Sequence, residues 1–167
     1  MVEYFLMQAR YNRLANQRVI DACTQLSDED FRRDRFGSYR TIHRTLNHIL
    51  LSDRTWLARF ESVNFGVRGL DTVLFDDLPA FAEARVSEDK RIERFVGSLS
   101  DRALRSVLHY RNSAGKPFSE SLYLLLGHFF NHQTHHRGQI HAMLSQTHVK
   151  PISLDMHRMI NVETQAG

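Results

Sequence analysis

The stretch His128-Phe-Phe-Asn-His132-Gln-Thr-His135-His136-Arg137-Gly138-Gln139 decides the fold of this chain. Read as a helix, it places His128, His132 and His136 at every fourth position, so three imidazoles share one face. Neighbours in such a stripe have Cβ atoms about 5–6 Å apart, and two imidazoles so placed can converge on one ion with bonds of about 2.0–2.1 Å. A core helix gains nothing from them, because each ring must satisfy two nitrogens. The stretch therefore predicts a helix that carries a metal site.

Three further long helices are predicted around this one. Apolar residues recur at helical spacing in four segments, which are residues 3–26, Thr41–Phe60, Pro79–Leu99 and Ser119–Gln146. Ser38 is a candidate start signal for the second helix, and Pro79 suits the first turn of the third. Four long amphipathic helices in one small domain imply a four-helix bundle, in which facing helices build the site.

The shorter elements lie between and after these helices. Segments 104–110 and 117–120 flank the turn-type cluster Asn112-Ser-Ala-Gly-Lys116, which predicts a small β-hairpin before the last long helix. A short helix is expected at Ser153–Ile160 with Ser153 as its cap, and segment 61–79 reads as a long irregular connection. The expected fold class is all-α, and residues 1–167 should form a single domain.

Composition limits the classes of function. The chain is 42% apolar and 25% charged with a net charge of +3, and its arginines are interleaved with acids. A nucleic-acid binder usually concentrates basic charge on one face, so no nucleic-acid partner is expected. The longest apolar run, Leu122–Leu126, is far too short for a membrane span, and the first residues do not resemble a signal peptide. With the lone Cys23, these features favour a cytoplasmic protein without a membrane partner.

The second helix supplies a third candidate ligand, His48, inside the apolar segment Leu46–Leu51. Taken alone, His48 would more often be a core histidine held by hydrogen bonds. Metal sites in bundles are built from inward side chains of facing helices, so the pair His132 and His136 changes that balance. We therefore expect His48, His132 and His136 to hold a divalent ion such as Zn²⁺, Ni²⁺ or Fe²⁺.

Three neighbours of these histidines have open alternatives. His128 could be a fourth ligand, line the pocket or donate to a carbonyl, whereas His135 is turned off the stripe and suits a supporting or core position. Arg137 could pair with a substrate anion, but a carboxylate on another helix is favoured. Gly138 costs about 1 kcal/mol relative to alanine in a helix, which predicts a close helix or ligand approach there.

The other candidate polar residues are interpreted as structural. Asp53 should face to the side of His48, as an N-cap or in an ion pair with Arg54 or Arg137, and Trp56 should lie in the core. Five histidines have no partner at ligand spacing and are expected to be structural or surface residues: His43, His109, His141, His148 and His157.

The chain resembles the DinB family of four-helix-bundle metalloenzymes. The resemblance spans nearly the whole chain and rests on Tyr11–Asn16, Leu46-Asn-His48-Ile-Leu with Asp53-Arg-Thr-Trp56, Asn131–Gln139 and Ser153–Asp155. The family's metal histidines fall on His48, His132 and His136, the same three that spacing selects. The resemblance also implies a homodimer and, from better-understood relatives, a low-molecular-weight thiol used in S-transfer or isomerisation.

Three functions follow from these observations. The first is a metal-dependent enzyme that acts on a small-molecule substrate with a thiol, as an S-transferase, or with metal-bound water. The second is a non-catalytic, metal-binding stress-response protein, and the third, least favoured, is DNA binding. A catalytic site needs an open metal position beside a pocket, whereas a structural site should be closed by a fourth protein ligand. Catalytic residues beyond the metal ligands are not identifiable from the sequence.

Overall fold

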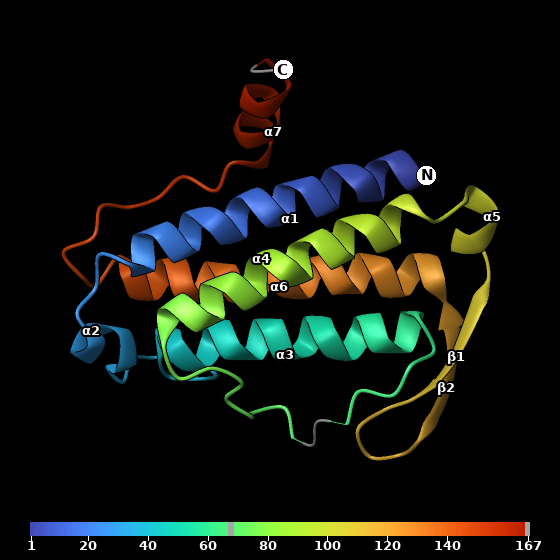
Figure 1. Cartoon of the computed structure of the whole chain (residues 1–167), viewed down its shortest axis with the longest axis horizontal. Helices are drawn as coiled ribbons and strands as arrows, with labels where there is room; N and C mark the ends of the chain where they lie inside the picture. The colour runs from blue at the N-terminus through green and yellow to red at the C-terminus, as the bar shows by residue number, and fades with distance from the viewer. Residues whose placement is uncertain (67–68, 166–167) are drawn as a thin grey trace.

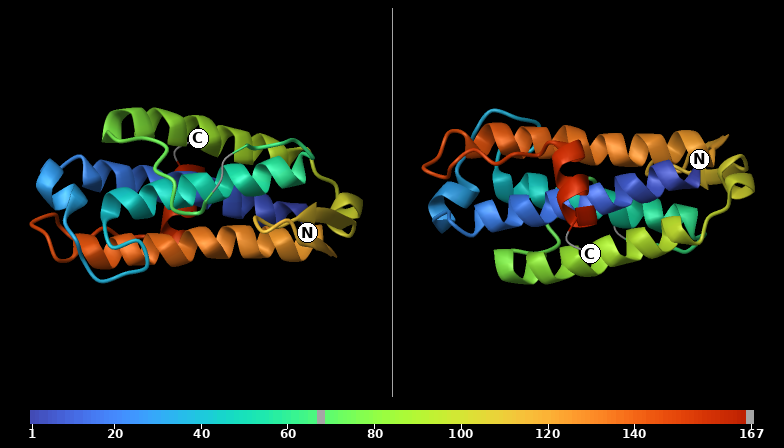
Figure 2. Two further views of the ribbon diagram at one scale, coloured as in Figure 1. Left: turned by 90° about the horizontal axis from the view of Figure 1, so that it is seen from below. Right: turned by 90° about the horizontal axis from the view of Figure 1, so that it is seen from above.

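Four long helices form the body of the molecule (Figure 1) in a computed structural model that describes residues 1–66 and 69–165. They are α1 (Val2–Cys23), α3 (Ile42–Phe60), α4 (Leu78–Gly97) and α6 (Leu122–Leu144). Helix α1 packs against α4 and α6, and α3 packs against the same two helices from the other side. Figure 2 shows α4 and α6 along opposite edges, with α3 on one face and α1 on the other. The predicted four-helix bundle is confirmed.

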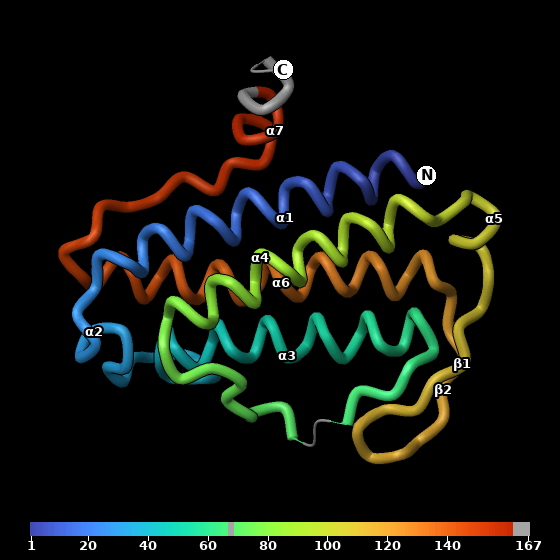
Figure 3. The backbone as a smooth tube through the Cα atoms, viewed as in Figure 1, coloured from blue at the N-terminus to red at the C-terminus, as the bar shows by residue number. Residues whose placement is uncertain are grey.

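The direction of the helices explains the long connection after α3. The colours of Figure 1 show that α3 and α4 run the same way, whereas α1 and α6 run the opposite way. Consecutive helices that run parallel need a connection that returns along the bundle. Segment 61–77 does this in the part that the structure describes, passing beside α3 (Figure 3). We call segment 61–77 the crossover.

The predicted hairpin and C-terminal helix are also present. Strands β1 (Val107–Arg111) and β2 (Pro117–Ser121) pair antiparallel with Tyr110 opposite Phe118, and α7 (Met156–Gln165) lies across α1. Two short helices were not anticipated, α2 (Asp28–Arg32) and α5 (Asp101–Leu104). Each follows a serine whose hydroxyl accepts a backbone N–H three residues on, which is the hydrogen bond of a helix N-cap.

The bounds of α3 agree with the expected Thr41–Phe60, but three serines that were expected to start or cap a helix do not do so. Helix α3 is capped by Thr41, whose side chain accepts the N–H of Arg44, and not started at Ser38. Ser119 belongs to β2, so α6 begins three residues later than expected. Helix α7 begins three residues after Ser153, whose hydroxyl instead accepts the nearby N–H of Asp155 in a local turn. Among the described residues, no helix is long and apolar enough to cross a membrane.

The bundle core has two apolar clusters separated by buried polar side chains. One cluster contains Val19, Leu50, Phe81 and Ile140, and the other contains Phe5, Leu57, Ile92 and Phe129. Between them along every helix lie side chains that we call the polar layer: Asn12, Asn16, Asp53, Arg85, Asp89, Gln133 and Arg137. Each is at most 5% exposed, so its polar atoms depend on partners within the layer. Most of them have one, whereas Arg85 Nε, Gln133 Oε1 and Arg137 Nε have no hydrogen-bond partner among the described residues.

Asp53, which was expected to face to the side of His48, lies at the centre of the polar layer. Its carboxylate is 1% exposed, lies 2.5 Å from Arg85 Nη1 and accepts a 2.6 Å hydrogen bond from Gln133 Nε2. The expected ion pair is therefore present, but its partner is Arg85 of α4 and not Arg54 or Arg137. Burial raises the pKa of Asp53 to about 6, and the opposing attraction of Arg85 does not fully offset this.

The other half of the layer joins α4, α1 and α6. Asp89 lies 3.0 Å from Arg85 Nη2 and accepts hydrogen bonds from Asn12 and Asn16. The side-chain oxygens of the same two asparagines accept from Arg137, whose guanidinium is 2% exposed. Arg137 therefore contacts side-chain oxygens of Asn12, Asn16 and Thr134, and not the carboxylate on another helix that was expected.

Candidate metal centre

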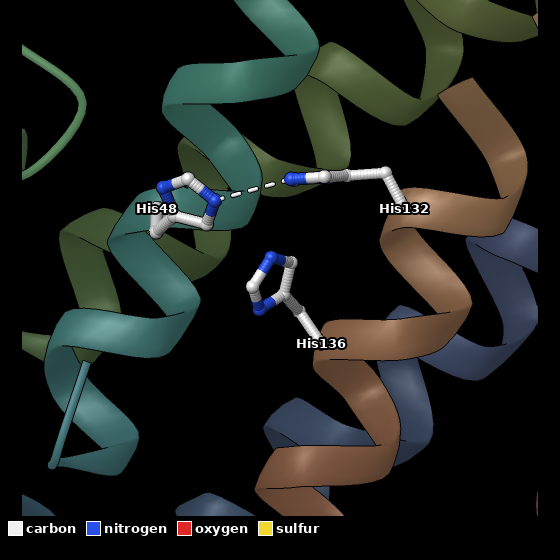
Figure 4. A group of neighbouring side chains, drawn as sticks. All are labelled: His48, His132 and His136. Carbon is white, nitrogen blue, oxygen red and sulfur yellow. Dashed lines mark hydrogen bonds between the residues drawn. The ribbon is translucent and has the colours of Figure 1, made fainter. Parts of the chain in front are cut away.

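Three histidines from two helices face one another across the gap between α3 and α6 (Figure 4). His48 comes from α3, and His132 and His136 come from consecutive turns of α6. One ring nitrogen from each lies within 4.8 Å of the others, and the Nε2 atoms of His48 and His132 are 3.2 Å apart. Two nitrogens bound tetrahedrally to one ion at about 2.0–2.1 Å would lie about 3.3 Å apart. The spacing of the three predicted residues therefore fits a metal ion.

The tautomer of His48 is fixed by the crossover. Its Nδ1 lies 3.0 Å from the carbonyl oxygen of Leu70, and because a carbonyl can only accept, Nδ1 carries the proton. In the neutral ring Nε2 is then a bare lone pair that points at His132. The adjacent Asn47 holds the crossover in place, since its side-chain oxygen accepts the N–H groups of Leu74 and Phe75.

A second such contact orients His136. Its Nδ1 donates to Gln139 Oε1 at 2.9 Å, which leaves Nε2 bare in the neutral ring. Gln139 Nε2 in turn lies 3.1 Å from His135 Nε2, so His135 supports the site through Gln139. Partners of this kind, bonded to the far nitrogen of a metal histidine, hold its ring in the orientation that binding requires.

The 3.2 Å pair of His48 and His132 has a consequence for protons. Because His48 Nε2 is bare, the shared proton belongs to His132 Nε2 when no metal is bound. A shift of that proton to His132 Nδ1 would leave two lone pairs side by side, which is favourable only if a cation lies between them. A single tautomer change at His132 would therefore leave both Nε2 atoms free to bind a cation.

Burial keeps these rings neutral. It lowers the pKa of His132 to about 3 and that of His136 to about 4, and the neighbouring histidines lower that of His132 further. The pKa of His48 is also lowered by burial, against a smaller opposing effect of its hydrogen bond to Leu70. All three are therefore in the neutral form that binds metals at pH 7, without competition from protons.

Aromatic and hydroxyl groups complete the wall around His48. The ring of Tyr39 stacks on the His48 imidazole with centroids 3.9 Å apart, and it contacts His136 edge-on at 5.7 Å. Ser52 lies one turn further along α3, with Oγ 3.4 Å from His48 Nε2. Tyr39 belongs to the loop before α3, so the site is bordered by two loops as well as by two helices.

His128 stands apart from the three. It is exposed, its ring centroid is 6.0 Å from that of His132, and it packs edge-on against the half-buried Trp56 at 5.5 Å. Arg137 faces the polar layer and not the histidines. No other described helix comes close to Gly138, which corrects that half of the expectation, because a Cβ built there meets no atom within 4 Å beyond its own helix and the residue is exposed.

The remaining histidines behave mainly as structural groups. Three of them bond to backbone carbonyl oxygens at 3.0 Å, His43 to Phe75, His141 to Ile152 and His148 to Gln25. His109 bonds to the Ser119 hydroxyl across the hairpin, and His157 is exposed.

Sequence reasoning missed three supports of the site and the cavity beside it. Gln139 is three residues after His136, so helical spacing could have revealed it, whereas Tyr39 and Leu70 come from loops that carry no such pattern. A cavity of about 350 Å³ lies between α3, the crossover and the turn of the hairpin. Ser52 and Leu70 line it, and both also contact His48, so the cavity adjoins the site. We call it the α3 cavity.

Known proteins show the same combination of fold and sequence. The family model described as DinB family matches residues 1–166. Protein DinB of Bacillus subtilis (strain 168) is 27% identical over 153 residues, which cover 87% of each protein. A DinB-like protein from Bacillus cereus ATCC 10987 has a similar crystal structure, with a TM-score of 0.70 and 20% identity over 90% of this chain and 95% of that one. The chain with this bundle and histidine cluster is therefore a member of the DinB family.

Proposed function

We propose that His48, His132 and His136 bind one divalent metal ion and that the protein is a metal-dependent enzyme for a small-molecule substrate. The observation that carries this proposal is the convergence of three neutral imidazoles, two of them oriented by hydrogen bonds to their far nitrogens. An apolar core would not need such orientation, whereas a metal site does. Three imidazoles suit Zn²⁺, Ni²⁺ or Fe²⁺, and cellular supply decides among them.

The number of protein ligands favours catalysis over a purely structural role. In the part of the chain that the structure describes, no fourth histidine, cysteine or carboxylate joins the cluster. Three protein ligands leave a position for a water or a substrate atom, and the α3 cavity adjoins it. A bound divalent ion would lower the pKa of a thiol or water at that position.

The reaction that fits best is transfer of a low-molecular-weight thiol, with hydrolysis by water as the second choice. Thiolate sulfur is a good ligand for zinc-like ions, and the family resemblance implies thiol chemistry. The proposal includes a cytoplasmic homodimer, which the same resemblance implies. The alternative is a non-catalytic metal-binding stress-response protein, in which the ion only braces α3 against α6.

Cobalt spectroscopy tests the open position. Protein purified without nickel resin is loaded with Co²⁺, and thiols such as glutathione and cysteine are then added. A sulfur-to-cobalt charge-transfer band is expected, and His132→Ala should lose both the metal and the band. His157→Ala, a change at an exposed histidine, is the matched control and should behave as the unmodified protein. A spectrum unchanged by every thiol would contradict the thiol reading.

Removal of the metal separates the enzyme from the alternative. A structural site contributes folding energy outright, so a chelator should then unfold the protein. If the site is catalytic, the two apolar clusters should keep the helices folded after chelation, because burial of apolar surface supplies most of their stability. Far-ultraviolet circular dichroism with and without chelator measures the difference.

A further inference from the structure

The α3 cavity has cationic walls. Two arginines line it, Arg59 from α3 and Arg111 from the hairpin, together with polar side chains such as Asn64 and Ser113. No aspartate or glutamate is among its described lining residues. A concave site with cations and no acid attracts negatively charged groups.

Arg59 is held in place without an anionic partner. Its guanidinium lies over the ring of Trp56 at 4.7 Å and over that of Tyr110 at 5.2 Å. Tyr110 is itself fixed, because its hydroxyl donates to Glu120 at 2.5 Å. No hydrogen bond or ion pair of Arg59 to another described residue is present, so the N–H groups of the stacked guanidinium remain available.

The electrostatics of Arg59 are unusual for a cation near the surface. Burial lowers its pKa, and no carboxylate opposes that effect. Burial has removed part of the water around this guanidinium, and no counter-ion replaces it. Binding of a carboxylate or phosphate should therefore be favourable, because either group can form two parallel hydrogen bonds with the guanidinium.

Arg111 adds a second donor from the hairpin. Its Nη1 donates to the carbonyl oxygen of Gly115 at 2.7 Å, which ties the side chain to the hairpin turn. The turn itself is fixed by Asn112, whose side-chain oxygen accepts the N–H groups of Ala114 and Lys116. Arg111 is exposed, so its attraction for an anion should be weaker and more sensitive to salt.

We propose that the α3 cavity binds the anionic end of the substrate, a carboxylate or phosphate, through Arg59 and Arg111, while the reactive end reaches the three histidines. The assignment of this anion site to the substrate rests on the proposed function. Ser52, beside His48, and Arg59 lie seven residues apart on α3, or about 10 Å at the rise of an α-helix. The substrate is thus an elongated molecule, with its negative charge about that far from its reactive atom.

Trp56 provides a direct readout of anion binding. It is the only tryptophan in the sequence, it lines the cavity, and it stacks with Arg59. Titration with succinate and with inorganic phosphate at constant ionic strength should give a saturable change in its fluorescence. The neutral analogue succinamide should give none. The better of the two anions distinguishes a carboxylate site from a phosphate site.

Three substitutions locate the anion. The affinity of each variant for the anion is measured by calorimetry, because the first substitution also perturbs Trp56. Arg59→Gln should weaken binding about tenfold or more, the usual effect of losing a charge-assisted hydrogen bond at a desolvated site. Arg111→Gln should weaken it about two- to fivefold, as for an exposed charge. Arg105→Gln, a change at an exposed arginine of α5's end, is the control and should have no effect. Equal affinities in all three variants, or no saturable response to either anion, would overturn the proposal.

The link to the histidines is tested with an elongated thiol. Glutathione should produce the cobalt charge-transfer band at lower concentration than its diethyl ester, which lacks both carboxylates and keeps only the ammonium charge. Arg59→Gln should reduce that preference about tenfold. A preference that is the same in Arg59→Gln and in the unmodified protein would refute the role of the cavity in substrate binding.

Failure of this inference and failure of the proposed function give different results. His132→Ala should lose the metal but keep the Trp56 response, because His132 does not line the α3 cavity. Metal binding without an anion response would refute the anion site alone. If the unmodified protein responds to anions but binds no metal, the proposed metalloenzyme is refuted. The assignment of the anion to a substrate is then refuted with it.

Discussion

Replacement of Asp53 by alanine should lower the free energy of unfolding by about 3–5 kcal/mol at pH 8, where this carboxyl, whose pKa is about 6, is ionised. The change removes the contact with Arg85 at 2.5 Å and the hydrogen bond from Gln133 at 2.6 Å. Arg85 would keep only Asp89 as a close carboxylate, and the buried amide of Gln133 would lose its acceptor, which costs about 1–3 kcal/mol. Because the two losses share one cavity, they should not add fully.

Urea unfolding, followed by circular dichroism, measures this effect. The dependence on urea should keep its slope, because the surface exposed on unfolding does not change much. Asp34→Ala is the matched control, since Asp34 pairs with Arg40 at the surface, and it should leave the midpoint almost unchanged. If the two variants unfold at the same urea concentration, the view of Asp53 as the buried centre of the polar layer is refuted.

Three further results are expected. His136→Ala should abolish stoichiometric metal binding while the helical circular dichroism persists; unchanged metal content by elemental analysis would mean that the ligands were wrongly chosen. Gly138→Ala should raise the free energy of unfolding by about 0.5–1 kcal/mol, because alanine favours the helix and its Cβ meets no atom; a thermal melt showing destabilisation would contradict this. With the metal removed by a chelator, the contribution of His132 to the free energy of unfolding should be complete above pH 6.5 and should be lost as the pH falls toward about 3. The reason is that the unfolded chain binds a proton at His132 before the folded chain does. His132→Gln should therefore flatten the dependence of the unfolding free energy on pH between 6.5 and about 4.

Periodicity accounts for what the sequence revealed. A helix repeats every 3.6 residues, so the apolar positions of four segments predicted four helices, and the spacing of His132 and His136 predicted a shared face. His48 could be added because metal sites in bundles are built from inward side chains of facing helices, so the pair on one helix favoured a histidine on another. The helix beginnings were less certain, since serine and threonine cap helices but also occur in turns and strands, as Ser119 does in β2.

The errors came from features that periodicity does not carry. The partner of Asp53 depends on which helix packs beside α3, and the parallel order of α3 and α4 is decided by the crossover. Helical spacing relative to His48 gave the side of the helix on which Asp53 lies but not what it meets there. Gly138 was expected to allow a close contact because glycine weakens helices, but its position on the outside of α6 is visible only once the packing is known.

The polar layer also fixes the position of the helices relative to one another along the bundle axis. Apolar side chains tolerate exchange of neighbours, so a slide of α6 along α3 by one turn, about 5.4 Å, would be only weakly opposed by the two apolar clusters. The same slide would separate Gln133 from Asp53 and leave charges facing apolar neighbours, which is far more costly. His132 immediately precedes Gln133 in α6, so the setting that satisfies the layer also fixes the height of the histidines opposite His48. We therefore expect the three histidines to be aligned before a metal binds. The charged side chains of the polar layer, which do not contact the metal, would supply this alignment.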